Sequence, residues 1–262
     1  MFNTLLYQPF LNTLMYLYQH LGGNLGLAII VFTIIIKLIL AWPSASFIRS
    51  QRKIQALQPK LQALKRKHQN DREGLSRATM ALYKESKVNP FTSCLPTLIQ
   101  LPILFALYKV FLSGLQTEAE TGLLKSDQLE LLYGPLKDAF ASTPINTVFF
   151  PGLDLAQTGI FVGSVIIAAL AGVAQYWQSR MIAAPPAPKV AGAQDERLAA
   201  MTSRQMTYLF PIITVVIIVS LPIGLGLYWL TSILFTVAQQ YLVLGQLRRQ
   251  EDANANHPQP TP

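Results

Sequence analysis

This sequence of 262 residues is poor in charge and in cysteine, and both shortages restrict its class. Charged side chains make up 13% of the chain and hydrophobic ones 51%, which is typical of a polytopic membrane protein and not of a soluble domain. The single cysteine, Cys94, excludes an internal disulfide and a cysteine metal cluster. The three histidines, His20, His68 and His257, are scattered without the spacing of metal ligands. We therefore expect no metal ion and no other cofactor.

Other absences bear on function. No aspartate or glutamate lies within any expected span, so the carboxylate pair of a membrane-embedded enzyme is missing and we expect no enzyme. A channel or transporter would show several intramembrane polar sites or two repeats, and neither is visible. No nucleotide-binding loop of the form GxxxxGK[ST] is present. Residues 1–23 contain no lysine or arginine, so we expect no cleavable signal peptide.

The chain is organised around the apolar stretch from Leu25 to Pro43, which is long enough to cross a bilayer. Inside it lies one cation, Lys37, and an ammonium in a spanning helix costs about 2.5–3.5 kcal/mol unless water or a partner meets it. Thr33 lies one helical turn earlier, on the same face. This face predicts a hydrated interior. The alternative is that Lys37 snorkels to the interface near Trp42.

The first 23 residues place apolar side chains at helical intervals, with polar ones between them. This pattern predicts a helix lying on the membrane surface, kinked or restarted at Pro9. The alternative is an ordinary first span, which the regular polar interruptions disfavour. Residues 24–43 then form the first predicted span.

Residues 44–90 are highly charged, with eleven lysines and arginines against three acids. Two apolar stripes at helical spacing predict a helical hairpin standing off the membrane. Pro59 should kink or restart its first helix, and Asn70 followed by Glu73 resembles a helix N-cap box. The alternative is a solvated, irregular loop. The stripes consist of Ile54, Leu57, Leu61 and Leu64, and of Leu75, Ala78 and Leu82.

The rest of the chain alternates between spans and connections. We predict a second span at 91–115, a loop at 116–157, a third span at 158–178 and a linker at 179–205. Leu221-Pro222-Ile223-Gly224 divides 206–244 into a fourth and a fifth span joined by a tight turn. Residues 245–262 are expected to be a disordered tail. Gln100, within the second span, either faces the same hydrated interior as Lys37 or joins two helices by a hydrogen bond.

The positions of the cations give an orientation. Lysines and arginines number none before the first span, eleven after it, two after the second and four after the third. Loops rich in cations remain in the cytoplasm. We therefore expect the N-terminus outside, and the charged hairpin and the C-terminus inside. Five spans agree with that alternation.

Four runs of sequence resemble the YidC/Oxa/Alb membrane protein insertases. They read IIVFTIIIKLILAWP, LQPKLQALKRK, MALYKESKVNPFTSCLPTLIQLPILFALY and LPIGLGLYWLTSILFTVAQQ. The resemblance implies an all-α polytopic membrane protein of the bacterial plasma (inner) membrane. Its five transmembrane helices would surround a hydrophilic groove that is open to the cytoplasm and closed on the outer side. The cytoplasmic helical hairpin and the N-terminal interfacial helix would complete the fold.

The resemblance also implies a substrate-binding groove with one cation, usually arginine, and Lys37 stands at that position. Thr33 matches a polar groove position, and Trp229 falls where one branch of the family has a tyrosine. Gln100 and Ser232 would add hydrogen-bonding groups. The expected function is that of a membrane protein insertase and chaperone. Its partners would be nascent membrane proteins and the lipid bilayer, with the ribosome and the Sec translocon as further candidates.

Overall fold

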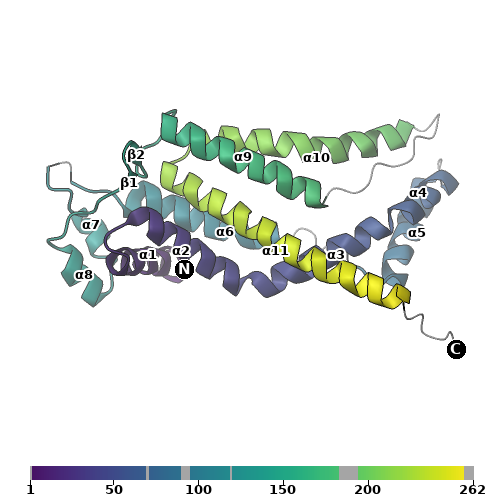
Figure 1. Ribbon diagram of the computed structural model, residues 1–262, viewed down its shortest axis with the longest axis horizontal. Helices are drawn as coiled ribbons and strands as arrows, with labels where there is room; N and C mark the ends of the chain where they lie inside the picture. The colour runs from purple at the N-terminus through teal and green to yellow at the C-terminus, as the bar shows by residue number, and fades with distance from the viewer. Residues whose placement is uncertain (1, 69–70, 90–94, 119, 183–193, 257–262) are drawn as a thin grey trace. The chain divides into compact units, whose positions relative to one another are not determined.

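The computed structural model describes all residues except 1, 69–70, 90–94, 119, 183–193 and 257–262. Over the described residues the chain is mostly helical, as predicted, and it divides into two compact units (Figure 1). Unit 1 comprises Met1–Ile39, Leu98–Tyr176 and Phe210–Phe235, and unit 2 comprises Leu40–Thr97, Trp177–Leu209 and Thr236–Pro262. All five residues of the predicted groove belong to unit 1. Cys94 and Asn70 lie outside the described residues.

Among the described residues, one helical stretch, Ile223–Gln250, is long and apolar enough to cross a membrane. There are two such spans if α2 (Leu25–Ile39) and α3 (Ala41–Ala56), which follow one another at a break, are taken as one. Leu98–Gly114 and Thr207–Val219 are shorter apolar helices. The helical class is therefore confirmed, whereas the arrangement of five spans stays a prediction.

In unit 1, the ends of several helices meet at a small β-hairpin of β1 (Val148–Phe150) and β2 (Leu153–Asp154), which pair antiparallel. Gly26 of α2 lies so close to Phe149 that a Cβ would have no room. Gly163, at the start of α9 (Val162–Ile182), is equally close to Leu153. The first amides of α11 (Ile223–Asn256) donate to the segment after β2. The hairpin thus contacts the starts of α2 and α9, and the chain that follows it contacts the start of α11.

Two other helices end in the same region. α6 (Leu95–Lys109) continues into the π-helical turn η3 (Val110–Gly114), where Phe111 packs closely against Gly224 of α11. α10 (Gln194–Val219) ends beside α11, where Ile218 lies near Gly226. Gly172 lets α9 approach α10 closely at Val215. Three helix starts and two helix ends therefore gather at one end of unit 1.

The N-terminal segment forms the π-helical turn η1 (Asn3–Tyr7) and the helix α1 (Gln8–His20). Its apolar stripe is buried inside the protein, because Leu11, Leu14 and Met15 are fully covered. α1 packs against α2, and it also contacts η3 and α8 (Gly134–Phe140). We define the cap as residues 3–20 together with 116–157, which also hold the short helix α7 (Ser126–Leu129).

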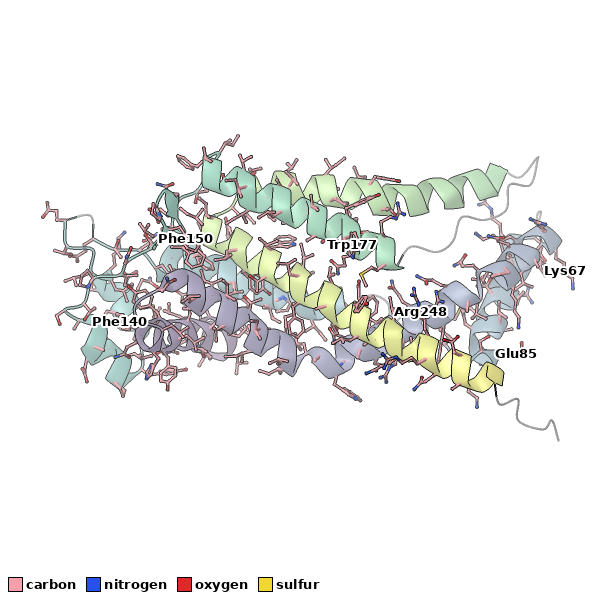
Figure 2. The ribbon with its side chains drawn as sticks, viewed as in Figure 1. Lys67, Glu85, Phe140, Phe150, Trp177 and Arg248 are labelled. Carbon is pink, nitrogen blue, oxygen red and sulfur yellow. The ribbon has the colours of Figure 1, made fainter. Side chains whose placement is uncertain are left out.

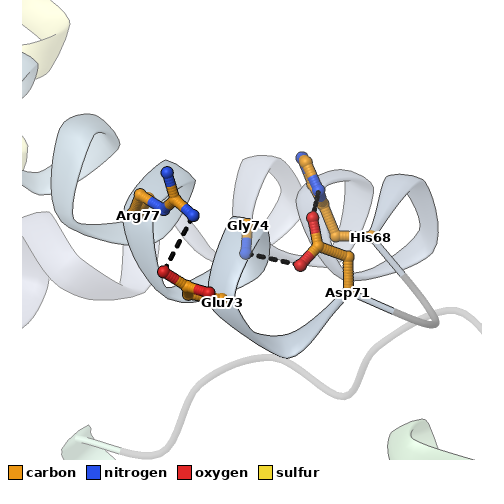
Figure 3. A network of polar contacts seen from close by, with 5 residues as sticks. All are labelled: His68, Asp71, Glu73, Gly74 and Arg77. Carbon is orange, nitrogen blue, oxygen red and sulfur yellow. Dashed lines mark hydrogen bonds and ion pairs between the residues drawn. The ribbon is translucent and has the colours of Figure 1, made fainter.

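Unit 2 contains the charged hairpin, which we define as α4 (Gln58–Lys67) and α5 (Arg72–Glu85). The two helices contact each other and bury Leu61 and Leu82, so this region is not an irregular loop. α3 ends at Ala56 and α4 begins at Gln58, so the helix is interrupted at Leu57, two residues before Pro59. The N-cap of α5 is Asp71 and not Asn70, because the Asp71 side chain accepts the Gly74 amide at 2.8 Å (Figure 3).

Two boundaries differ from the prediction. α10 begins at Gln194, so residues 194–205 of the predicted linker are helical, and residues 183–193 lie outside the described part. α11 continues to Asn256, so disorder was wrongly predicted for residues 245–256. Leu, Gln, Arg and Glu extend an already formed helix at little cost, which explains why the polar composition misled us. Residues 257–262 lie outside the described part of the chain.

Candidate functional site: polar residues on α2, α6 and α11

Lys37 and Thr33 occupy one face of α2, four residues apart, as the sequence predicted. Thr33 is fully buried, and its hydroxyl donates to the Ile29 carbonyl of its own helix at 2.6 Å. A hydroxyl satisfied within its helix adds little cost at this depth. Lys37 lies one turn further on and is half-buried. The face therefore leads from a buried hydroxyl to a partly exposed ammonium.

Burial changes sharply along α2. Its first half is covered: Leu25, Ala28 and Phe32 are at most 3% exposed. Its last turn is open, with Leu38 60% and Ile39 73% exposed. Lys37 therefore lies where the packing of unit 1 against α2 comes to an end.

α11 shows a related pattern. Ile223, Leu225 and Tyr228 near its start are at most 2% exposed. Beyond Ile233, Leu234 is 52% exposed, and burial resumes only in unit 2, at Gln240 and Val243. Within unit 1 the starts of α2 and α11 are both packed next to the β-hairpin and the cap, so unit 1 is closed at that end.

Gln100 of α6 is joined to α11 by a hydrogen bond. Its side-chain amide donates to the hydroxyl of Tyr228, which is buried. This contact supports the interpretation of Gln100 as a residue that joins two helices, which was one of the two alternatives from the sequence. It also makes Tyr228 a polar residue of this region that the sequence reasoning missed, because attention fell on its neighbour Trp229.

Two further predicted groove residues lie on α11. Ser232 is buried, one helical turn after Tyr228, and Trp229 is half-buried. Tyr228 and Ser232 are four residues apart and share a face, whereas Trp229 points about 100° away from Tyr228 around the helix. The hydrogen-bonding face of α11 is therefore the one with Tyr228 and Ser232. The convergence of all five residues on one groove stays a prediction.

The cap closes unit 1 with a polar network. The Asn12 side chain donates to the Leu131 carbonyl at 2.9 Å and accepts the Tyr133 amide at 2.6 Å. The Tyr18 hydroxyl accepts the Asn146 amide at 2.8 Å. These bonds connect α1 to the loop at 116–157, although the two are more than 100 positions apart in the sequence.

A second set of contacts surrounds Tyr7. Its hydroxyl donates to Gln128 at 2.6 Å, and burial, assisted by the Asp127 carboxylate, raises the pKa of Tyr7 to about 12. The ammonium of Lys109, at the end of α6, lies 4.6 Å from the centre of the Tyr7 ring and donates to Asn3. Lys109 is thus a contact of the cap.

The described residues contain no group of three or more histidine, cysteine, aspartate or glutamate side chains able to hold a metal ion. The predicted groove residues and Tyr228 offer an ammonium, hydroxyls, an amide and an indole N–H. Such groups bind anionic and hydrogen-bonding ligands.

Comparison with known proteins identifies the family of this chain. The sequence profile of the 60Kd inner membrane protein family matches residues 16–250. The chain is 35% identical over 222 residues to a protein of Fusobacterium nucleatum named membrane protein insertase YidC, covering 85% of this chain and 87% of that protein.

Longer relatives carry the same name. The chain is 33% identical to one from Coxiella burnetii over 84% of its own length, and 31% identical to one from Geobacter sulfurreducens over 91%. It spans only 31% and 37% of the length of these two relatives. Because the match covers nearly the whole chain, this protein belongs to the 60Kd inner membrane protein family, whose relatives named here are YidC insertases.

Proposed function

We propose that this protein is a membrane protein insertase. It moves short polar flanks of nascent membrane proteins through a groove that opens to the cytoplasm, and it releases their apolar helices into the bilayer. The groove is formed by Lys37 and Thr33 of α2, Gln100 of α6, and Trp229 and Ser232 of α11, to which we add Tyr228. The change in burial at Lys37 is the single observation that carries this proposal.

The mechanism follows from the cost of polar groups in hydrocarbon. A translocating flank carries backbone groups that each cost several kcal/mol when they are left without hydrogen bonds in lipid. A groove of half the membrane height shortens the path through lipid. Lys37 attracts acidic side chains of the flank, while hydroxyls and the Gln100 amide bind its backbone. Burial of the apolar helix of the client in the bilayer supplies the free energy.

The arrangement of helix ends supports the orientation. The starts of α2, α9 and α11 and the ends of α6 and α10 gather near the β-hairpin and the cap, as alternating spans require. With the cation-rich segments in the cytoplasm, this end faces outward. The N-terminus is then outside, and the C-terminus and the charged hairpin are inside. The charged hairpin, with its many cations, receives the client or contacts the anionic RNA of the ribosome. The Sec translocon is a further candidate partner.

The test is insertion of a short-tailed client in cells depleted of their own insertase. We expect Lys37→Ala to slow insertion of a client with an acidic tail about fivefold, because a hydrated ion pair contributes roughly 1 kcal/mol. Lys37→Glu should slow it further, because the carboxylate repels the tail. A client whose tail carries no charge should respond much less.

Lys125→Ala is the matched control, because Lys125 is an exposed cation of the cap bonded to Gln116. This variant should insert both clients at the rate of the parent protein. If Lys37→Ala and Lys37→Glu both match the parent with the acidic client, the charge of Lys37 has no role in insertion.

A further inference from the structure

Two apolar side chains of the β-hairpin, Val148 and Phe150, are exposed on the surface of the protein. In β1 the middle residue, Phe149, packs against Gly26 of α2, and the centre of its ring lies 4.2 Å from that of Phe150. The pairing of β1 with β2 is irregular between Val148 and Phe150, and both of these side chains remain partly exposed. Val148 is 45% exposed and Phe150 is 59% exposed. Phe150 is labelled in Figure 2, close to the start of α9. Phe150, at the end of the strand and next to a Pro-Gly turn, thus contacts Phe149 with one side of its ring and leaves more than half of its surface exposed.

This exposed surface continues onto α9. Leu153 of the hairpin packs against Gly163, so the hairpin and the start of α9 are in contact. Ile160 and Val162, around that start, are 81% and 78% exposed. The exposed apolar surface then follows the helix through Val165, Ile166, Leu170 and Val173. Asp154 is the one charged residue between positions 141 and 177.

The occupant of this surface follows from its continuity. In a membrane protein, an apolar stripe along a helix without charges faces acyl chains. α9 carries no charge before its last turn, and its stripe runs past the helix start onto the β-hairpin. The hairpin itself cannot enter the hydrocarbon core, because its turn has backbone groups that need water. Aromatic side chains are enriched at the level between the two environments.

We propose that the hairpin is an interfacial anchor, with Phe150 and Ile160 inserted among the lipids of the leaflet at which α9 begins. The hairpin touches the starts of α2 and α9, and the chain after it holds the start of α11, so the anchor fixes the depth of all three helices. This inference rests on the proposed placement of α9 in the membrane but not on insertase activity.

Site-directed spin labelling tests the anchor. In a Cys94→Ser background, spin labels are attached at Phe150→Cys and at Ile160→Cys, and the full-length protein is reconstituted in vesicles of phosphatidylethanolamine and phosphatidylglycerol. Collision rates with oxygen, which concentrates in lipid, are compared with those of a water-soluble nickel chelate. The control is Ala141→Cys, an exposed position at the end of α8 in the same cap.

We expect the ratio of oxygen to nickel collisions to be severalfold higher at positions 150 and 160 than at position 141. Equal ratios at the three positions would overturn the anchor, because they would place the hairpin in water. Low access for both reagents at position 150 would also overturn it, because it would mean that protein covers this side chain. Val148→Cys repeats the measurement at the other exposed side chain of β1 should the label at position 150 disturb folding.

Client insertion by the same vesicles separates this inference from the proposed function. Lipid-exposed labels in vesicles that insert no client would refute the insertase and leave the anchor in place. Active vesicles with water-exposed labels would refute the anchor alone.

Discussion

The cap and the charged hairpin are both helical, but they are held together in different ways. In the cap, hydrogen bonds join residues 119 to 128 positions apart, such as Asn12 with Leu131 and Tyr18 with Asn146. In the charged hairpin, the hydrogen bond from the Gly74 amide to Asp71 joins residues three positions apart, and the Glu73–Arg77 ion pair joins residues four positions apart (Figure 3). These hydrogen bonds of the cap are partly buried, whereas both members of that ion pair are more than 75% exposed.

The difference teaches where stability is concentrated. A buried polar group that loses its partner costs about 1–3 kcal/mol, whereas an exposed ion pair contributes about 0.2–1 kcal/mol. The cap is therefore the more stable of the two regions, and local unfolding of the charged hairpin costs less free energy.

The largest effect is expected from Asn12→Leu in the cap. Leucine keeps the volume but leaves the Tyr133 amide, which takes part in a partly buried hydrogen bond, without its acceptor. The Leu131 carbonyl keeps one donor, the Gln8 side chain. We expect a loss of about 1–3 kcal/mol in the free energy of unfolding. Thermal unfolding in detergent and hydrogen exchange at the Tyr133 amide measure it.

Thr13→Val is the control for Asn12→Leu. Thr13 is exposed and bonds only to the Pro9 carbonyl of its own helix, so a change below about 0.5 kcal/mol is expected. If the two variants unfold alike, the network around Asn12 does not hold the cap.

A smaller effect is expected from alkaline pH, and it should also be confined to the cap. The folded pKa of Tyr7 is about 12 and its ordinary value is 10.0. Between these values the unfolded chain loses the phenol proton while the folded chain keeps it, so stability falls as pH rises from 10 to 12. Below pH 10 the group has no effect.

Unfolding of the parent and of Tyr7→Phe across this pH range tests the shift. Phenylalanine removes the titrating group, so the variant should lose less stability than the parent between pH 10 and 12. Parallel curves would show that Tyr7 titrates normally. Hydrogen exchange in α5 should not distinguish the two proteins, because the charged hairpin does not contain this group.

The smallest effect is expected from Asp71→Ala in the charged hairpin. It removes the acceptor of the Gly74 amide and should lower the stability of the start of α5 by about 1 kcal/mol. Hydrogen exchange at the first turn of α5 reports this loss. Glu73→Ala, which breaks an exposed ion pair, should cost about 0.5 kcal/mol or less. Equal effects of the two variants would contradict the assignment of Asp71 as the N-cap.

The charged hairpin was largely predictable because its determinants are local. An apolar stripe, a proline and a helix N-cap lie within a few positions of one another, and the structure that they predict does not depend on the rest of the chain. Even there, Asn70 and Asp71 were confused, because both residue types are good N-caps and the sequence does not show which side chain reaches the amide.

The partners of the predicted site were less predictable. Gln100 could be recognised as a polar residue in an apolar run, but its contact with Tyr228 depends on the relative rotation of α6 and α11. Tyrosine is common in apolar helices and Trp229 is adjacent, so no pattern in the sequence selected Tyr228. The tail was missed because helix extension from α11 outweighed its polar composition.

The sequence by itself determined that the chain is helical, apolar and cationic between its apolar runs, and it placed one ammonium and one hydroxyl on a single face. These properties follow from side-chain chemistry and helical periodicity alone. Only the tertiary structure decided that α1 buries its stripe against α2 and that Asn12 holds the loop at 116–157. It also decided that the β-hairpin contacts the starts of α2 and α9. The physical reason is that a contact between distant segments depends on the shape and rotation of both partners, which no local pattern records.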